Sequence, residues 1–113
     1  MRPIQSILIA NRGEIALRIL RTCKRLGIEP VAIYSELDRN ELFVRYASRA
    51  FLLEGETPLS CYLDGTQIVQ IALKAGCQAI HPGYGFLSEQ ANFARQVEEA
   101  GLVFIGPTPD CME

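Results

Sequence analysis

The stretch Ser6-Ile7-Leu8-Ile9-Ala10-Asn11-Arg12-Gly13-Glu14 decides the fold, because it leads from a buried strand directly into a helix. Its first five residues form a short apolar run that suits a strand covered on both faces. Residues 14–26 then carry apolar side chains at helical spacing, and Gly27 fits the left-handed position after a helix. A second apolar run follows at 30–35. The segment therefore predicts a strand, a helix and a second, parallel strand.

The same order of helix, glycine and apolar strand occurs twice more along the chain. We expect further helices over 65–75 and 89–100, and further strands over 50–53, 78–81 and 102–105. Alternating strands and helices with continuously apolar strands indicate a parallel sheet. The prediction is an α/β fold, a Rossmann-like doubly wound parallel sheet of about five strands with helices on both faces.

Local signals refine the limits of the helices. Asp64 is expected to cap the helix over 65–75, with Gln67 completing a capping box. Ser88 is expected to cap the helix over 89–100. The polar stretch before the third strand leaves room for one short helix at 41–46, and 54–60 is interpreted as a loop.

Bulk composition narrows the class of protein. The chain has 113 residues, 49% of them hydrophobic and 21% charged, with a net charge of -2. This indicates one soluble domain with no demand for nucleic acid or an anionic membrane. No apolar run is long enough to span a membrane and no secretory pattern is present, so we expect a cytoplasmic protein.

The cysteines are widely spaced and there is one histidine, so no metal site is expected. Free thiols are expected at Cys23, Cys61, Cys77 and Cys111.

Three segments are expected at the carboxyl edge of the sheet, where such folds bind ligands: 11–14, 81–89 and 106–107. A dinucleotide is disfavoured, because the turn after the first strand has one glycine and Glu14 lies where a pyrophosphate would dock. Glu36 and Asp38, which could otherwise hold a ribose, are then interpreted as solvated loop charges.

The segment 81–89, His-Pro-Gly-Tyr-Gly-Phe-Leu-Ser-Glu, carries the clearest site signal. Its two glycines permit a tight turn and a close approach by another group. Tyr84 suits either stacking on a planar ligand or packing on the rim. His81 is interpreted as hydrogen-bonded within its own turn rather than as a proton carrier, and Arg12 as paired with Glu14 or another acid of the rim.

Arg18, Arg21 and Arg25 share one face of the first helix, which is typical of a solvated face or of a subunit interface. No nucleophile with a paired base and no two-carboxylate arrangement stands out. The residues therefore favour a binding platform over a complete active site.

Several segments closely resemble the start of biotin carboxylases: 7–16, 18–21, 32–35, 79–89 and 104–107. The resemblance implies that 1–113 is the N-terminal, pre-ATP-grasp domain of such an enzyme. The family uses ATP, Mg²⁺ and bicarbonate to carboxylate biotin on a carrier protein. The resemblance places the nucleotide and metal ligands in ATP-grasp and C-terminal domains that this chain does not include. It implies that the chain alone has no catalytic residue, binds no cofactor and is inactive.

By the same resemblance, Tyr84 and Gly85 form one wall of the biotin pocket, and His81 and Gly83 shape its loop. The first helix contributes to a homodimer interface, with Arg18 and Arg21 as candidates. The implied partners are a biotin carboxyl carrier protein or domain and a carboxyltransferase. The final acyl acceptor stays open among acetyl-CoA, propionyl-CoA, methylcrotonyl-CoA and pyruvate.

The sequence departs from the family pattern at a few positions. Arg25 stands where many relatives carry an acid, which puts a dimer ion pair there in doubt. Residues 48–49, Cys61 and Gln90 also differ from the common residues. Two alternatives remain: a stand-alone binding module of the same fold, and another ATP-grasp ligase.

Overall fold

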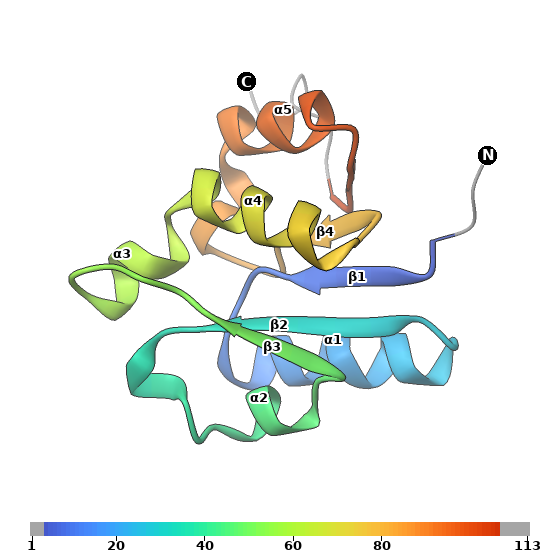
Figure 1. Ribbon diagram of the computed structural model, residues 1–113, viewed down its shortest axis with the longest axis vertical. Helices are drawn as coiled ribbons and strands as arrows, with labels where there is room; N and C mark the ends of the chain where they lie inside the picture. Colours follow the sequence, from blue (N-terminus) through green and yellow to red (C-terminus); the bar gives the residue numbers. More distant parts are fainter. Residues whose placement is uncertain (1–3, 107–113) are drawn as a thin grey trace.

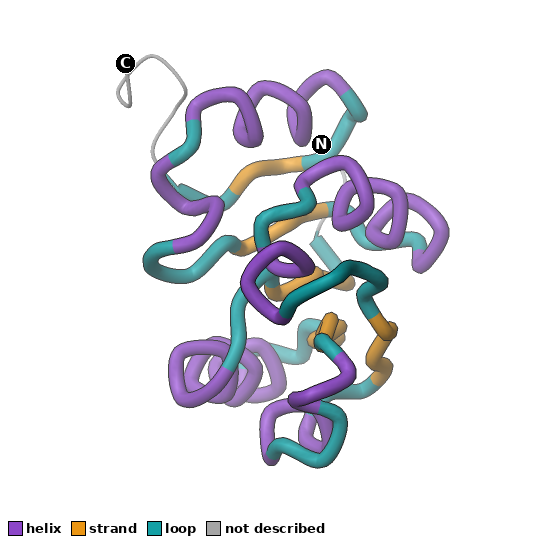
Figure 2. The backbone as a smooth tube through the Cα atoms, turned by 90° about the vertical axis from the view of Figure 1, so that its left-hand side faces the viewer, coloured by secondary structure: helices purple, strands orange, loops and turns teal. Residues whose placement is uncertain are grey.

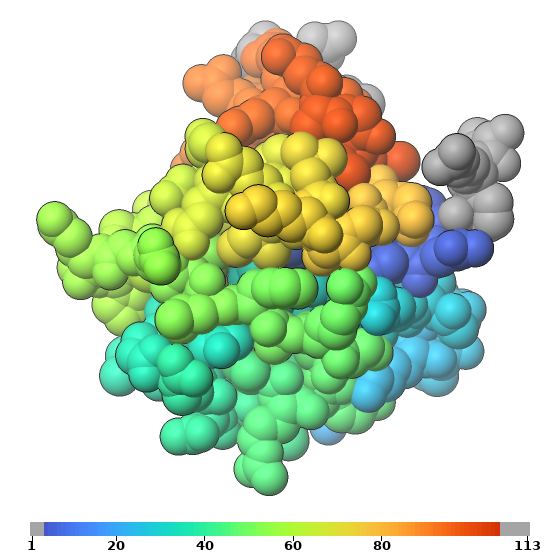
Figure 3. Space-filling model, viewed as in Figure 1, coloured from blue at the N-terminus to red at the C-terminus, as the bar shows by residue number. Residues whose placement is uncertain are grey.

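The computed structural model describes residues 4–106 and contains a five-stranded sheet in which every neighbouring pair is parallel (Figure 1). The strand order is β3-β2-β1-β4-β5. The strands are β1 (Ser6–Ile9), β2 (Glu29–Tyr34), β3 (Arg49–Leu52), β4 (Ala79–His81) and β5 (Val103–Phe104). The space-filling view shows the segment around edge strand β3, in green, at the molecular surface (Figure 3). The predicted parallel, Rossmann-like sheet is confirmed.

Helices cover both faces of this sheet, as expected (Figure 2). One face packs against α1 and α2, and the other against α3, α4 and α5. The helices are α1 (Gly13–Arg25), α2 (Leu42–Tyr46), α3 (Pro58–Tyr62), α4 (Gly65–Ala75) and α5 (Ala91–Glu99), with 3₁₀ turns η1 (Glu36–Asp38) and η2 (Phe86–Glu89).

Alternation along β1 divides the core between these two layers. Ile7 and Ile9 pack toward Leu20 of α1, whereas Leu8 packs toward Ile68 of α4. All five side chains are buried, four of them with no exposed surface. Each such side chain contributes about 1.5–3 kcal/mol through removal from water, so both layers hold the sheet in place.

Two local expectations were wrong. Residues 54–60 are not entirely loop, because α3 begins at Pro58; the side chain of Thr57 accepts a hydrogen bond from the Ser60 amide and starts the helix. Ser88 does not cap the last helix, because it lies inside η2. The backbone becomes extended only at Gln90, which is the N-cap of α5.

The expected cap of α4 is confirmed, with one difference in the partner. The Asp64 carboxylate accepts from the Gln67 amide at 3.1 Å. The Gln67 side chain, however, donates to the Asp64 carboxylate and to the Glu54 carbonyl rather than returning to the cap backbone. This joins the start of α4 to the segment that follows β3.

The thiol prediction holds for the part of the chain that the structure describes, where Cys23, Cys61 and Cys77 are free and buried. Burial raises the pKa of the Cys23 and Cys77 thiols. Cys111 and Pro107 lie outside the described residues. Within residues 4–106, no helix is long and apolar enough to cross a membrane. The cytoplasmic location stays a prediction.

Candidate functional site

The sheet has its topological switch point between β1 and β4. The chain leaves β1 into α1 on one face and leaves β4 toward α5 on the other face. Connections that diverge in this way open a crevice beyond the carboxyl ends of the two strands, where open α/β sheets bind ligands. The segments after β1 and β4 therefore supply the candidate site.

Asn11 joins these two segments directly. Its Nδ2 donates to the Pro82 carbonyl at 2.8 Å and to the Tyr84 carbonyl at 2.7 Å. Its Oδ1 accepts from the Arg12 amide at 2.8 Å. The residue is 1% exposed, so these bonds are shielded from water. Asn11 thus holds the loop after β4 against the end of β1.

The loop backbone explains why glycine stands on each side of Tyr84. Gly83 has φ +69°, and a Cβ there would lie 2.6 Å from Asn11 Nδ2, so a side chain would displace the anchor. Gly85 has φ 68° and ψ -163°, a region that essentially only glycine adopts. Both positions therefore need glycine for the loop to keep this path.

His81 serves its own turn, as the sequence indicated. Its Nδ1 accepts a hydrogen bond from the Gly83 amide at 3.0 Å, which requires Nδ1 to be unprotonated. Burial lowers the pKa of His81 and favours that neutral form. The histidine shapes the turn, and among residues 4–106 its side chain makes no hydrogen bond besides the one from the Gly83 amide.

Tyr84 is the exposed feature of the site, with 78% of its surface accessible. The loop borders an open, mainly apolar cleft of about 370 Å³ beside the end of β5. Its lining is His81, Pro82, Gly83, Tyr84, Ser88, Glu89, Ile105 and Gly106. The structure therefore brings the 81–89 segment together with Gly106, as predicted for segments at the carboxyl edge of the sheet. The tyrosine is not packed on the rim and its ring is available to a ligand.

A second hollow of about 360 Å³ follows α1 and also ends at Tyr84. It is lined by apolar side chains of α1, among them Ile15 and Ile19, and by Arg18. Tyr84 and His81 thus border both hollows, the one beside β5 and the one along α1.

Arg18, Arg21 and Arg25 line one further groove of about 460 Å³, together with Thr22 and Tyr46. Within residues 4–106 these three arginines make no ion pair. The expected single face is confirmed, and it presents unpaired positive charge to solvent. Arg18 lines both this groove and the hollow that Tyr84 borders.

The interpretation of Asp38 as a solvated charge was wrong. Its side chain is 3% exposed and accepts from Arg12 through Nε and Nη2, both at 2.7 Å. The Tyr62 hydroxyl donates to the same carboxylate at 2.7 Å. Arg12 beside it holds the pKa of Asp38 below its usual range. Burial of the Asp38 side chain beneath these partners keeps it from a ribose, whereas Glu36 is exposed and paired with Arg39.

Sequence reasoning placed Asn11 in the segment 11–14 at the binding edge but did not predict its bonds to the loop, and it gave Tyr62 no role. A signal for Asn11 existed, since it follows a buried strand directly at the binding edge. Tyr62 offered none, because its partners lie 24 and 27 residues away in sequence. Within the described range 4–106, no group of three or more His, Cys, Asp or Glu residues could hold a metal ion.

Comparison with known proteins places this geometry in a family. Residues 3–112 match the family model described as biotin carboxylase, N-terminal domain. The chain is 54% identical over 110 residues to a biotin carboxylase of Halalkalibacterium halodurans, covering 96% of this chain and 24% of that protein. It is 51% identical over 113 residues to a putative urea carboxylase of Emericella nidulans, covering all of this chain and 9% of that protein.

A solved structure is also similar in fold. The biotin carboxylase domain dimer of Hydrogenobacter thermophilus 2-oxoglutarate carboxylase, in complex with MgADP, ADP and bicarbonate, superposes with a TM-score of 0.94. It is 47% identical, and the match covers 99% of this chain and 24% of that chain. The chain therefore spans a quarter or less of the length of these relatives.

Proposed function

The chain belongs to the biotin carboxylase N-terminal domain family, and we propose that it frames the biotin side of an active site that carboxylates biotin with ATP and bicarbonate. In this proposal the protein is an ATP-dependent ligase, and Mg²⁺ neutralises the nucleotide phosphates when bound. The chain's own share is to present a wall for the biotin ring system.

The observation that carries the proposal is that Tyr84 is exposed while the backbone of its loop is fixed by hydrogen bonds. Asn11 takes two carbonyls of the loop, and Gly83 lets the backbone approach that side chain. The conformational entropy of the loop is therefore already lost on folding, so a ligand does not have to order the loop when it binds, which favours binding. The ring and the Gly85 backbone then offer an apolar surface and an open polar edge to a flat, partly polar ligand.

The test replaces Tyr84 with alanine in the full-length protein. Loss of the ring removes stacking area on one side of biotin, so we expect the KM for biotin to rise about tenfold or more, the equivalent of about 1.4 kcal/mol. ATP cleavage that depends on bicarbonate but not on biotin should change less than twofold. An unchanged KM for biotin would contradict the site.

Leu37→Ala is the matched control, because Leu37 is also 78% exposed and follows β2 at the same edge of the sheet. It lies outside the cleft beside Tyr84. It should leave both activities unchanged. A rise in the KM for biotin of equal size in both variants would show a general effect of exposed apolar side chains, not a biotin site.

We also propose that the groove of Arg18, Arg21 and Arg25 is part of a homodimer interface in the full-length protein. The absence of an ion pair for these arginines among the described residues supports it, as does the dimeric state of the Hydrogenobacter thermophilus domain. Arg21→Glu should weaken dimerisation, measured by sedimentation. A carrier protein bearing biotin and a carboxyltransferase complete the proposed set of partners.

A further inference from the structure

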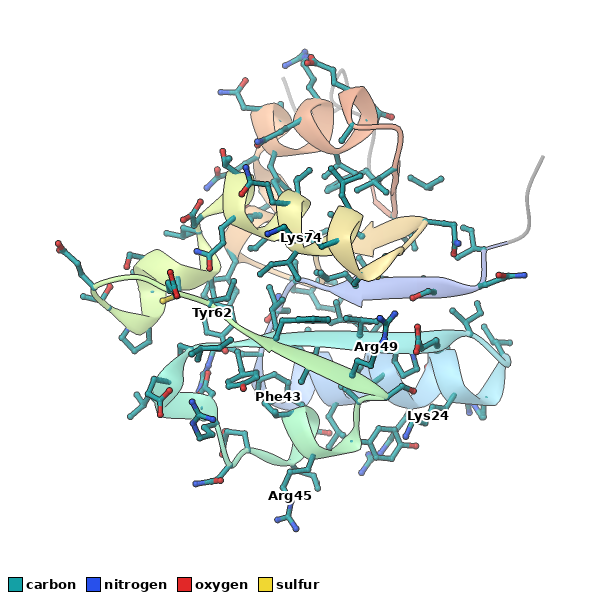
Figure 4. All side chains as sticks on the ribbon, viewed as in Figure 1. Lys24, Phe43, Arg45, Arg49, Tyr62 and Lys74 are labelled. Carbon is teal, nitrogen blue, oxygen red and sulfur yellow. The ribbon has the colours of Figure 1, made fainter. Side chains whose placement is uncertain are left out.

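A chain of polar side chains, buried at Asp38 and Tyr62 and 40% exposed at Arg12, lies beside the loop that carries Tyr84. It begins at Arg12, passes through the carboxylate of Asp38 and reaches the hydroxyl of Tyr62, in bonds of 2.7 Å each. Figure 4 labels Tyr62 on the side of the sheet toward which the strand arrows point. None of these three residues lines the cleft beside Tyr84.

Tyr62 is the member of this chain that contacts the loop. The residue is 1% exposed, and its hydroxyl accepts from the Ser35 amide at 3.1 Å while donating to Asp38. Two polar bonds therefore determine where its ring lies. That ring meets the ring of Phe86 at 5.6 Å between centroids, with a tilt of 43°.

Phe86 has an unusual backbone for a bulky residue. Its φ is 48°, the only positive value outside glycine among the described residues. Such a conformation costs about 1–2 kcal/mol and persists only where surrounding packing holds it. Phe86 follows Tyr84 and Gly85 directly, so the backbone at Phe86 sets the direction in which the loop continues.

The loop is thus held at both ends by one connected unit. Asn11 donates to the carbonyls of Pro82 and of Tyr84 itself, and its neighbour Arg12 holds Asp38. On the far side, Tyr62 supports Phe86. Asp38 is the buried member of the charge pair, with 3% of its side chain exposed, whereas 40% of the Arg12 side chain is accessible. The two hydrogen bonds at the Tyr62 hydroxyl fix the direction of its ring.

We propose that Tyr62 is a positioning residue for the carboxylation of biotin: its ring, oriented by Asp38 and the Ser35 amide, holds Phe86 in its left-handed conformation and so aims Tyr84 at the ligand. The inference rests on the proposed function and deepens it. Tyr62 touches no ligand in this account and acts through Phe86.

The test compares variants of the full-length protein. Tyr62→Leu removes the ring contact, and we expect the KM for biotin to rise about fivefold to tenfold while biotin-independent ATP cleavage changes less than twofold. Tyr62→Phe keeps the ring contact but removes both bonds that orient the ring, so the KM for biotin should rise by an intermediate amount, about threefold; a KM equal to that of the wild type would show that the hydroxyl does not orient the ring. Phe86→Leu removes the same ring contact from the other partner and should raise the KM for biotin to a similar extent. It tests the contact even where Tyr62→Leu folds poorly.

Phe43→Leu is the matched control. Phe43 is a buried aromatic residue of α2, in the core on the opposite face of the sheet. It should lower thermal stability with no rise in the KM for biotin. An equal rise in Phe43→Leu and Tyr62→Leu, or a rise in neither, would overturn the positioning role.

A readout without biotin separates this inference from the proposed function. Amide hydrogen exchange over 83–87 should be faster in Tyr62→Leu than in Phe43→Leu at matched stability. If exchange differs but Tyr84→Ala leaves the KM for biotin unchanged, the biotin site is wrong and the loop support stands. If exchange does not differ, Tyr62 does not position the loop.

Discussion

Replacement of Asn11 tests the central anchor of the site. Asn11→Ala removes three hydrogen bonds, to the Pro82 carbonyl, the Tyr84 carbonyl and the Arg12 amide. At about 1 kcal/mol net for each buried bond, the free energy of unfolding should fall by about 3 kcal/mol. That is a large share of the ~5–15 kcal/mol typical of a domain, and it should lower the Tm by about 10 °C or more.

Asn11→Asp separates the hydrogen bonds from the shape of the side chain. The substitution keeps the volume but places a second acceptor oxygen where Nδ2 now lies 2.7–2.8 Å from two carbonyl oxygens. Repulsion and the burial of an unpaired charge should make this variant less stable than Asn11→Ala. Below the pKa of the new carboxyl, one oxygen regains a proton to donate, so part of the loss should return.

Urea denaturation of the 113-residue chain, followed by circular dichroism, measures both variants. The reasoning predicts the order wild type, Asn11→Ala, Asn11→Asp in falling stability at pH 7. It is refuted if Asn11→Ala costs less than about 0.5 kcal/mol, because the bonds would then carry no net stability. It also fails if Asn11→Asp matches the wild type.

Three further predictions use the same denaturation assay. Gly83→Ala should cost about 1–3 kcal/mol more than Gly27→Ala, because both strain a positive φ but only the first meets Asn11, and equal costs would show that the anchor moves freely. The stability that His81 contributes should be present above its unfolded pKa of 6.5 and lost as the pH falls below that value toward its lower folded pKa, because the unfolded state binds the proton first. His81→Asn, whose side-chain oxygen accepts without titrating, should flatten this part of the pH profile, and an unflattened profile would assign it to another group. Thr57→Ala should cost about 1 kcal/mol through loss of the cap of α3, whereas a cost near zero would show that Pro58 alone starts the helix.

The sheet was predictable because its strands are read from local pattern alone. The run 6–10 is apolar at every position but one, and burial on both faces is the only setting that rewards such a run. The loop around Tyr84 was predictable because glycine and proline constrain the backbone whatever surrounds them.

The chain of polar side chains beside that loop was not predictable in the same way. Asp38 stands in a polar stretch, and only its meeting with Arg12, 26 residues earlier, makes burial of its charge tolerable. The failed cap at Ser88 has a similar origin, because burial of Leu87 favours the 3₁₀ turn over an earlier start of α5. Local signals give the elements, while long-range partners decide which polar residues enter the interior.

The bonds from Asn11 to the loop cross 71 and 73 residues of sequence. The pairing of β1 with β2 spans only 23 residues, so that unit closes a far shorter segment of chain. Loop closure costs more entropy as the segment lengthens, and distant contacts form later in folding. During synthesis β1 and β2 can therefore associate first, while the loop around Tyr84 takes its shape only after β4 has emerged and joined β1. The loop proposed to contact the ligand thus forms later than the unit of β1, α1 and β2.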